Sequence, residues 1–230
     1  MNENPVIIAL DLESADQART LVRQLGDSVR FYKVGMELYA SAGPDFASEL
    51  VAEGCQVFLD LKLHDIGETV KRAAAQVAKR GVRFLTVHAQ PQVMRAAMEG
   101  CAGTGLQILG VTVLTSLDQA DLWADGHSGS VEDLVTLRVR NAVAAGVHGI
   151  VCSPVEVARV RAITGPGAIL VTPGVRSAGA DAGDQKRVAT PRQAIIDGAN
   201  YLVVGRQVTR SADPRAEVEK ILAELPSAGA

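Results

Sequence analysis

Cysteine is scarce in this sequence of 230 residues, which contains only Cys55, Cys101 and Cys152. Three is an odd number, the residues lie far apart, and no C-x-x-C pair occurs. This pattern argues against a disulfide framework and against a cysteine zinc site. We therefore expect buried, reduced thiols in a cytoplasmic protein.

Long apolar runs are also lacking, since no stretch approaches the roughly 18 apolar residues that cross a bilayer. Asn2, Glu3 and Asn4 precede only about six apolar-rich residues before Asp11, which is not the layout of a signal peptide. Hydrophobic residues make up 47% and charged residues 21% of the chain, as is typical of soluble globular proteins. We expect no membrane partner.

An excess of positive charge is missing as well, because 23 Lys and Arg stand against 26 Asp and Glu, for a net charge of −3. This balance argues against nucleic acid as a main partner, although a local basic site for a small anion remains compatible with it. Neither H-x-H nor H-E-x-x-H occurs, so no metal site is indicated. No G-x-S-x-G motif marks a nucleophilic serine, and for His88 we expect a structural role.

The sequence does contain a regular alternation of short apolar runs and helical patterns. The runs that we expect to be strands are residues 5–10, 30–34, 55–61, 84–88, 107–113, 149–152, 168–171 and 201–204. The helical patterns are residues 14–25, 44–53, 69–79, 91–98, 118–122, 131–145, 154–163, 191–197 and 213–225. Ser14 is placed to cap the first helix, and Pro44 to open the second.

Eight such units predict a single closed (β/α)8 barrel, the TIM-barrel architecture, over residues 1–230. The runs are continuously apolar and rich in Val, Ile and Leu, as strands buried on both faces are. A doubly wound open sheet is the alternative, but no G-x-G-x-x-G follows the first strand. We expect one domain, with residues 226–230 as a frayed tail.

Charged residues follow the third apolar run, where Asp60, Lys62 and Asp65 lie within six residues. Side chains alternate across a strand, so Asp60 and Lys62 are expected on one face and the flanking leucines on the other. On a solvated strand end, the pair would be a weak surface salt bridge. In a barrel mouth, it would be an ionic site with shifted proton affinities.

The barrel prediction favours the second interpretation, because active sites of such barrels lie at the carboxyl ends of the strands. The polar residues at those ends are Asp11, Lys33, Asp60, Lys62, His88, Thr115, Ser116, Ser153, Arg176 and Arg206. Among the charged residues in this set, five follow strands one, two, three and eight. Their convergence on one rim predicts a site there.

Two glycine-containing segments with an arginine follow the last two strands. Thr172-Pro-Gly-Val-Arg176 follows the seventh, and Val204-Gly205-Arg206 follows the eighth. Barrels often bind phosphate at these loops, and the arginine fork matches phosphate oxygens. The polar segment 176–189 has the length of a lid, from which Gln185 could reach the anion.

The segment Asp60-x-Lys62-x-x-Asp65-Ile66-Gly67 resembles the D-x-K-x-x-D signature of the orotidine 5′-monophosphate decarboxylase family in its shorter bacterial form. The resemblance extends along nearly the whole chain. The other matching segments are Ala9-Leu-Asp11, Lys33-Val-Gly35, Val113-Leu-Thr-Ser116, Thr172-Pro-Gly-Val-Arg176, Asp184-Gln-Lys-Arg187 and Val203-Val-Gly-Arg206. One departure is Gln207, where the family usually has proline.

The resemblance implies decarboxylation of orotidine 5′-monophosphate to uridine 5′-monophosphate, in pyrimidine biosynthesis and without metal or cofactor. Lys62 is implied to protonate C6 of the base, beside Asp60 and Asp65. The implied catalytic residues are Lys62, Asp60, Asp65 and Lys33. The implied substrate-binding residues are Asp11, Thr69, Thr115, Ser116, Arg176, Gln185, Gly205 and Arg206. A homodimer is implied, in which Asp65 and Thr69 reach the neighbouring site.

Two other functions remain open at this point. The signature is shared with magnesium-dependent sugar-phosphate relatives, such as 3-keto-gulonate 6-phosphate decarboxylase and hexulose phosphate synthase. Those relatives usually carry an acid where Lys33 stands, and chelator-resistant activity would exclude this class. A non-catalytic nucleotide-binding barrel is the other, and the intact Asp60, Lys62 and Asp65 argue against it.

Overall fold

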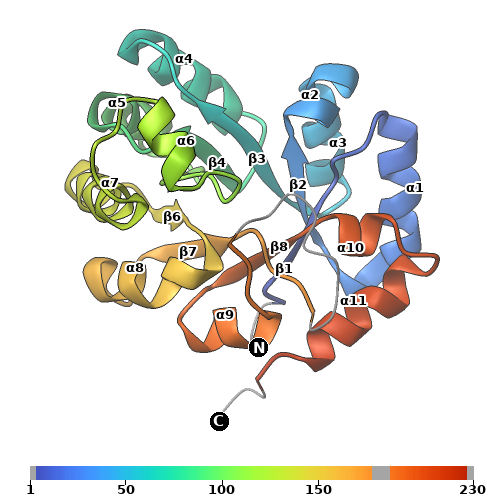
Figure 1. Cartoon of the computed structure of the whole chain (residues 1–230). Coiled ribbons are helices and arrows are strands. Elements are labelled where there is room, and N and C mark those ends of the chain that lie inside the picture. The colour runs from blue at the N-terminus through green and yellow to red at the C-terminus, as the bar shows by residue number, and fades with distance from the viewer. Residues whose placement is uncertain (1–3, 178–186, 227–230) are drawn as a thin grey trace.

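Eight parallel strands close into a barrel surrounded by helices (Figure 1), in a computed structural model that describes residues 4–177 and 187–226. The strands pair in chain order, and β8 pairs with β1 to complete the ring. Their bounds are β1 Val6–Ala9, β2 Phe31–Gly35, β3 Gln56–Leu63, β4 Phe84–His88, β5 Gln107–Val111, β6 Gly149–Val151, β7 Ile169–Thr172 and β8 Tyr201–Val204. The predicted closed (β/α)8 barrel is thus confirmed.

The helices follow the strands around the outside of the barrel. Their bounds are α1 Ala15–Leu25, α2 Met36–Ala42, α3 Asp45–Ala52, α4 Gly67–Ala78, α5 Pro91–Cys101, α6 Gln119–Ala124, α7 Val131–Ala145, α8 Val157–Thr164, α9 Pro191–Ile196, α10 Arg206–Thr209 and α11 Pro214–Ala223. Two 3₁₀ turns are η1 Gly26–Ser28 and η2 Pro154–Glu156. In the part of the chain that the structure describes, no helix has the length and apolar character that crossing a bilayer requires.

The predicted elements agree closely with the observed ones, and the differences have local causes. Ser14 caps α1 as expected, accepting a hydrogen bond from the Gln17 amide. Helices α2 and α10, of seven and four residues, were not predicted. The fifth strand ends at Val111 rather than at residue 113, and the third runs on to Leu63. Of the predicted tail 226–230, all but Pro226 lies outside the described residues.

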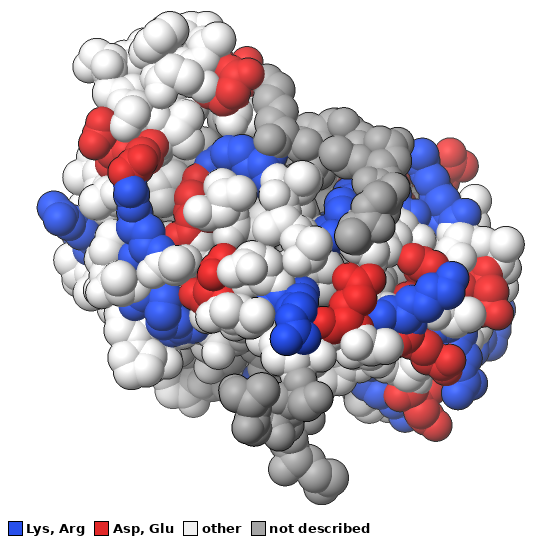
Figure 2. All heavy atoms as spheres, turned by 60° about the horizontal axis from the view of Figure 1, so that its bottom comes forward, with Lys and Arg blue, Asp and Glu red and all other residues white. Residues whose placement is uncertain are grey.

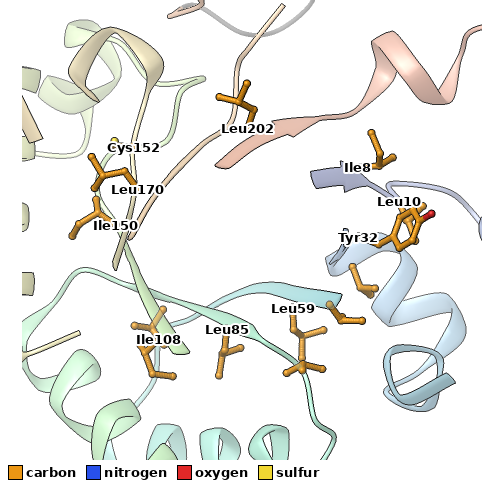
Figure 3. Close-up of a cluster of buried hydrophobic side chains, with 14 of the residues drawn as sticks. Ile8, Leu10, Tyr32, Leu59, Leu85, Ile108, Ile150, Cys152, Leu170 and Leu202 are labelled. Carbon is orange, nitrogen blue, oxygen red and sulfur yellow. The ribbon is translucent and has the colours of Figure 1, made fainter. Parts of the chain in front are cut away.

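Two apolar layers stabilise the barrel. Outward-facing strand side chains, among them Ile8, Leu85 and Leu170, pack with the buried faces of the helices (Figure 3). A smaller inner cluster fills the ring of strands and includes Ile7, Phe58, Phe84, Leu109, Val111, Val171 and Val203. Burial on both faces is the reason that the strands read as unbroken apolar runs.

An aromatic plug closes the amino-terminal end of the barrel. Arg83, just before β4, lies over the rings of Phe31, Phe84 and Tyr201 at 5.1–5.4 Å from their centroids. It also donates a hydrogen bond to the Tyr201 hydroxyl at 2.6 Å. Cation–π contacts and hydrogen bonds hold this guanidinium in place. With this end filled, the inner space opens at the carboxyl ends of the strands.

Strands β6 and β7 approach each other so closely that only glycine fits at position 149. A Cβ there would lie 2.2 Å from the carbonyl oxygen of Ile169 and 2.8 Å from its Cβ. Backbone atoms cannot move away without separating the two strands. The small residue at the start of β6 is therefore a condition for barrel closure.

We predict that Gly149→Ala lowers the free energy of unfolding by about 3 kcal/mol, because overpacking at a backbone contact has no cheap relief. Urea unfolding followed by circular dichroism measures the change. Gly105→Ala is the matched control, since a Cβ at Gly105 meets nothing within 4 Å. It should change the stability by no more than about 1 kcal/mol. Equal stability of the two variants would contradict the packing argument.

Candidate functional site

A cavity of about 430 Å³ opens at the carboxyl ends of the strands. Its walls contain nine of the residues predicted from the sequence: Asp11, Lys33, Asp60, Lys62, Thr115, Ser116, Arg176, Gly205 and Arg206. The structure therefore brings together the charged pair of β3 and both arginine segments, which are far apart in the sequence. A solvated strand end is excluded as the location of Asp60, which is only 9% exposed.

Four charges of alternating sign form a chain in this cavity. Lys33 Nζ lies 2.8 Å from Asp11 Oδ1 and 3.6 Å from Asp60 Oδ2, and Lys62 Nζ lies 3.0 Å from Asp60 Oδ1. Lys33 is 8% exposed, so its ammonium is largely removed from water. Because each inner charge has an opposite charge on either side, the set can be buried without an unpaired ion.

The neighbouring ammonium groups keep Asp60 ionised. Burial raises the pKa of this carboxyl, but the attraction of Lys33 and Lys62 outweighs it, together with hydrogen bonds from Lys62 and Thr86. The net effect lowers the pKa of Asp60 below its ordinary value. The site therefore presents a fixed carboxylate beside a fixed ammonium at neutral pH.

Thr86 supports this pair and was not predicted from the sequence. Its fully buried hydroxyl donates to Asp60 Oδ1 at 2.8 Å and accepts from the backbone N–H of Lys62 at 2.9 Å. Within the apolar run of β4, a threonine looks like any β-branched strand residue. The only signal in the sequence was a hydroxyl one strand away from Asp60.

The backbone of β3 is irregular where the site is built. Leu59 pairs with Leu85 and Leu63 with Val87, so four residues of β3 span the length of two in β4. Lys62 adopts φ of +49°, the left-handed region that is uncommon for a residue other than glycine. Simple alternation was therefore the wrong reason for placing Lys62 beside Asp60. A bulge and a strained residue aim the ammonium instead, as is common at functional sites.

Gly35 leaves room for the charge chain. It pairs with Asp60 across β2 and β3, and a Cβ on it would lie 2.6 Å from Asp11 Oδ1 and 2.8 Å from Lys33 Nζ. Any side chain at this position would displace one of the two charged groups. The absence of a side chain is thus part of the site.

Asp65 and Thr69 lie outside the cavity of their own chain. Both are exposed, and Asp65 Oδ1 accepts a hydrogen bond from the Ile66 amide at 2.6 Å. The chain of charges in this structure consequently ends at Lys62. Contact of Asp65 and Thr69 with a neighbouring site stays a prediction.

The segment that follows β7 is tied to the chain just before α9. Val175 and Ala189 form a β-bridge, and the Arg176 amide donates to the Ala189 carbonyl at 3.1 Å, which ties together the two ends of the predicted lid. Arg187 pairs with Glu156 and donates to the carbonyls of Val113 and Leu114. Gln185 lies outside the described residues, so its predicted contact is not tested.

Among residues 4–177 and 187–226, no group of three His, Cys, Asp or Glu side chains could hold a metal ion.

His88 is half-buried with its ring 5.2 Å from that of His64, and burial lowers the pKa of His88. On the face in Figure 2, the described Lys and Arg side chains are interspersed with Asp and Glu rather than gathered in a wide basic patch.

The lowered pKa of Asp60 predicts how stability depends on pH. A carboxyl group whose pKa is lower in the folded than in the unfolded state stabilises the fold at pH values above its unfolded-state pKa of about 3.9. This contribution is lost as the pH falls through the folded-state pKa. The Asp60→Asn variant should therefore lose less stability than the wild type when the pH is lowered. At pH 7 it should cost about 3 kcal/mol, since Lys62 loses its carboxylate.

Urea midpoints between pH 2 and pH 7 test this expectation. Asp45→Asn is the control, because Asp45 pairs with Arg80 at the surface with its side chain 93% exposed. That variant should follow the wild-type profile. If the urea midpoint of Asp60→Asn fell at low pH as much as that of the wild type, the role given to the ion pairs would be contradicted.

Comparison with known proteins shows which family the chain resembles along nearly its whole length. Residues 4–221 match the family described as "Orotidine 5'-phosphate decarboxylase / HUMPS family". A protein of Afipia carboxidovorans named Orotidine 5'-phosphate decarboxylase is 54% identical over 220 residues, 96% of this chain and 94% of that protein. One of Rhodopseudomonas palustris with the same name is 52% identical over 223 residues, covering 97% and 95%.

A solved structure shares the architecture. The crystal structure of Orotidine 5'-phosphate decarboxylase from Lactobacillus acidophilus superposes with a TM-score of 0.87 at 36% sequence identity. The match covers 98% of this chain and all of the other. The similarity therefore extends over nearly the whole chain.

Proposed function

Because the chain belongs to the orotidine 5′-phosphate decarboxylase / HUMPS family as an orotidine 5′-phosphate decarboxylase, we propose that its cavity decarboxylates orotidine 5′-monophosphate with Lys62 as the proton donor and without metal or cofactor. The observation that carries the proposal is the 3.0 Å contact between Lys62 Nζ and Asp60 Oδ1, in a cavity that also holds Arg176 and Arg206. One cavity thus contains an ammonium group for the base and two guanidinium groups for the phosphate.

The substrate would lie across the cavity with its two ends held separately. Arg176, Arg206 and Gly205 bind the phosphate, since arginine forks match its oxygens. Thr115 and Ser116, from the loop after β5, meet the pyrimidine edge. The ribose then lies over the Asp11 and Lys33 pair.

The reaction breaks the bond between C6 and the carboxylate carbon. Carbon dioxide leaves, the electron pair stays on C6, and a proton moves from Lys62 Nζ to that carbon. The fixed ammonium stabilises the negative charge as it develops. Asp60, kept ionised by its neighbours, lies beside the substrate carboxylate and disfavours the bound ground state. Solvent returns the proton to Lys62 after release.

The proposed metal independence is supported by the ion pairs that the carboxylates make. Asp11 and Asp60 are both within ion-pair distance of Lys33, and Asp60 is also paired with Lys62. Two ammonium groups among these oxygens would repel a divalent cation. This arrangement favours the decarboxylase over a magnesium-dependent sugar-phosphate enzyme.

A homodimer would complete the charge chain. Asp65 and Thr69 project from the rim, and Ile66 between them is 69% exposed. An exposed isoleucine beside an exposed carboxylate fits a surface that a second subunit covers. In the dimer, Asp65 would place a second carboxylate near the partner's ammonium, which favours its protonated form.

We predict that the wild-type protein releases carbon dioxide from orotidine 5′-monophosphate with EDTA present, and that Lys62→Ala lowers kcat by roughly 10³-fold or more, because both the cation and the proton donor are lost. Binding of uridine 5′-monophosphate, measured by calorimetry, should change far less. Lys71→Ala is the control, since Lys71 of α4 pairs with Glu99 of α5 at the surface.

The outcomes separate the candidate functions. Activity that EDTA abolishes would favour a magnesium enzyme, and binding of uridine 5′-monophosphate without turnover would favour a non-catalytic barrel. Wild-type rates in Lys62→Ala would end the role assigned to the lysine.

We also predict that Thr86→Val lowers kcat by about 10- to 100-fold, because hydrogen bonds to charged groups contribute about 1.5–3 kcal/mol and this one orients Asp60. Steady-state kinetics measures the effect. Thr172→Val is a matched control on β7, since the buried Thr172 hydroxyl has no hydrogen-bond partner in the described structure. Equal kinetics in both variants would show that Thr86 does not position Asp60.

A further inference from the structure

Gln207 is a polar residue of the site region to which no role has yet been given. It is the second residue of α10 and directly follows Arg206. The residue is partly buried, and its side chain forms hydrogen bonds with two other segments. These are Ser177, which directly follows Arg176, and Glu217 in the first turn of α11.

The carboxamide of Gln207 uses both of its ends in these contacts. Nε2 donates to Ser177 Oγ at 2.8 Å and to Glu217 Oε1 at 2.8 Å. Oε1 accepts from the Ser177 backbone N–H at 3.3 Å. Both N–H bonds are thus engaged, and the bond to the carboxylate of Glu217 is of the stronger, charge-assisted kind.

These contacts join three parts of the chain that are distant in sequence. Ser177 belongs to the segment after β7, Gln207 to the segment after β8, and Glu217 to a helix packed on the outside of the barrel. Val218, next to Glu217, is fully buried, so the helix is a rigid support. A side chain anchored on it can fix the distance between the residues on either side.

We propose that Gln207 is a positioning residue, which holds the Arg176 and Arg206 segments at the spacing that a phosphate group requires. The inference rests on the proposed function, because it takes these two arginines as the phosphate-binding pair. Gln207 does not line the cavity and touches no part of the substrate. It acts by limiting the freedom of two arginine segments that must converge on one anion, so that less ordering is needed on binding.

The test uses ligands with and without a phosphate on the same variants. For Gln207→Ala, we expect the Kd of uridine 5′-monophosphate and of inorganic phosphate to rise by about 3- to 10-fold, the range expected from losing one or two hydrogen bonds. The Kd of uridine should not change, since its contacts lie at the other end of the cavity. Calorimetry on the full-length protein gives all three values.

Gln207→Pro separates the side-chain contacts from the backbone. Proline fits the first turn of a helix, where the backbone N–H of Gln207 has no intrahelical acceptor to lose. This variant keeps the local backbone and should show the same loss as the alanine variant. Gln193→Ala is the control, because Gln193 makes a comparable bond to Asp197 on the remote helix α9.

A double-mutant comparison checks that the Ser177 contact carries the effect. Ser177→Ala should weaken phosphate-bearing ligands in the same direction, and adding it to Gln207→Ala should give little further loss. Unchanged binding of uridine 5′-monophosphate in both Gln207 variants would overturn the proposal. So would an equal loss of uridine affinity, which indicates general damage to the barrel.

Failure of the proposed function gives a different result. If the wild-type protein binds uridine 5′-monophosphate but does not turn over the orotidylate, the decarboxylase assignment is contradicted. The comparison of ligands with and without phosphate would still test the role of Gln207. A wild-type protein with no preference for phosphate-bearing ligands would overturn both.

Discussion

The contact between the Lys62 ammonium and the Asp60 carboxylate is the interaction on which the rest of the site depends. A charge that is largely removed from water is tolerated only when an opposite charge and hydrogen bonds compensate it. The structure meets this condition with Lys33 on the other side of Asp60 and with the hydroxyl of Thr86. Asp11 then compensates Lys33, so the chain of charges runs out to the cavity mouth.

Several features that look unrelated in the sequence serve this one arrangement. Gly35 lacks the side chain that would displace Asp11 or Lys33. The bulge in β3 and the left-handed conformation of Lys62 turn the ammonium toward Asp60. These local departures from ideal strand geometry cost stability, which the two apolar layers of the barrel supply.

The barrel separates its stabilising and its chemical parts along one axis. Arg83 and three aromatic rings fill the amino-terminal end, while the charged residues and both arginines occupy the carboxyl end. Under the proposed function, phosphate binding far from C6 can contribute to catalysis only if the arginines are already in place. The hydrogen bonds of Gln207 to Ser177 and Glu217 give a physical means for that.

The architecture was readable from the sequence because buried parallel strands are apolar on both faces and the chain alternates them with helical patterns. The rim of the site was readable for a related reason, since parallel strands of a barrel end at one face, and Asp11, Lys33, Asp60 and Lys62 stand at those ends. Shorter features left no such trace. Four residues of α10 cannot show a period.

What only the tertiary structure decided is which polar groups touch. That Thr86 bonds to Asp60 depends on the register of β3 against β4, and that register contains a bulge with no marker in the sequence. Gln207 appeared in the sequence only as a departure from a motif, and its partners became visible once three distant segments were packed together. Periodicity records how each segment meets solvent and core, whereas a hydrogen bond between segments depends on ångström-scale placement that the whole barrel sets.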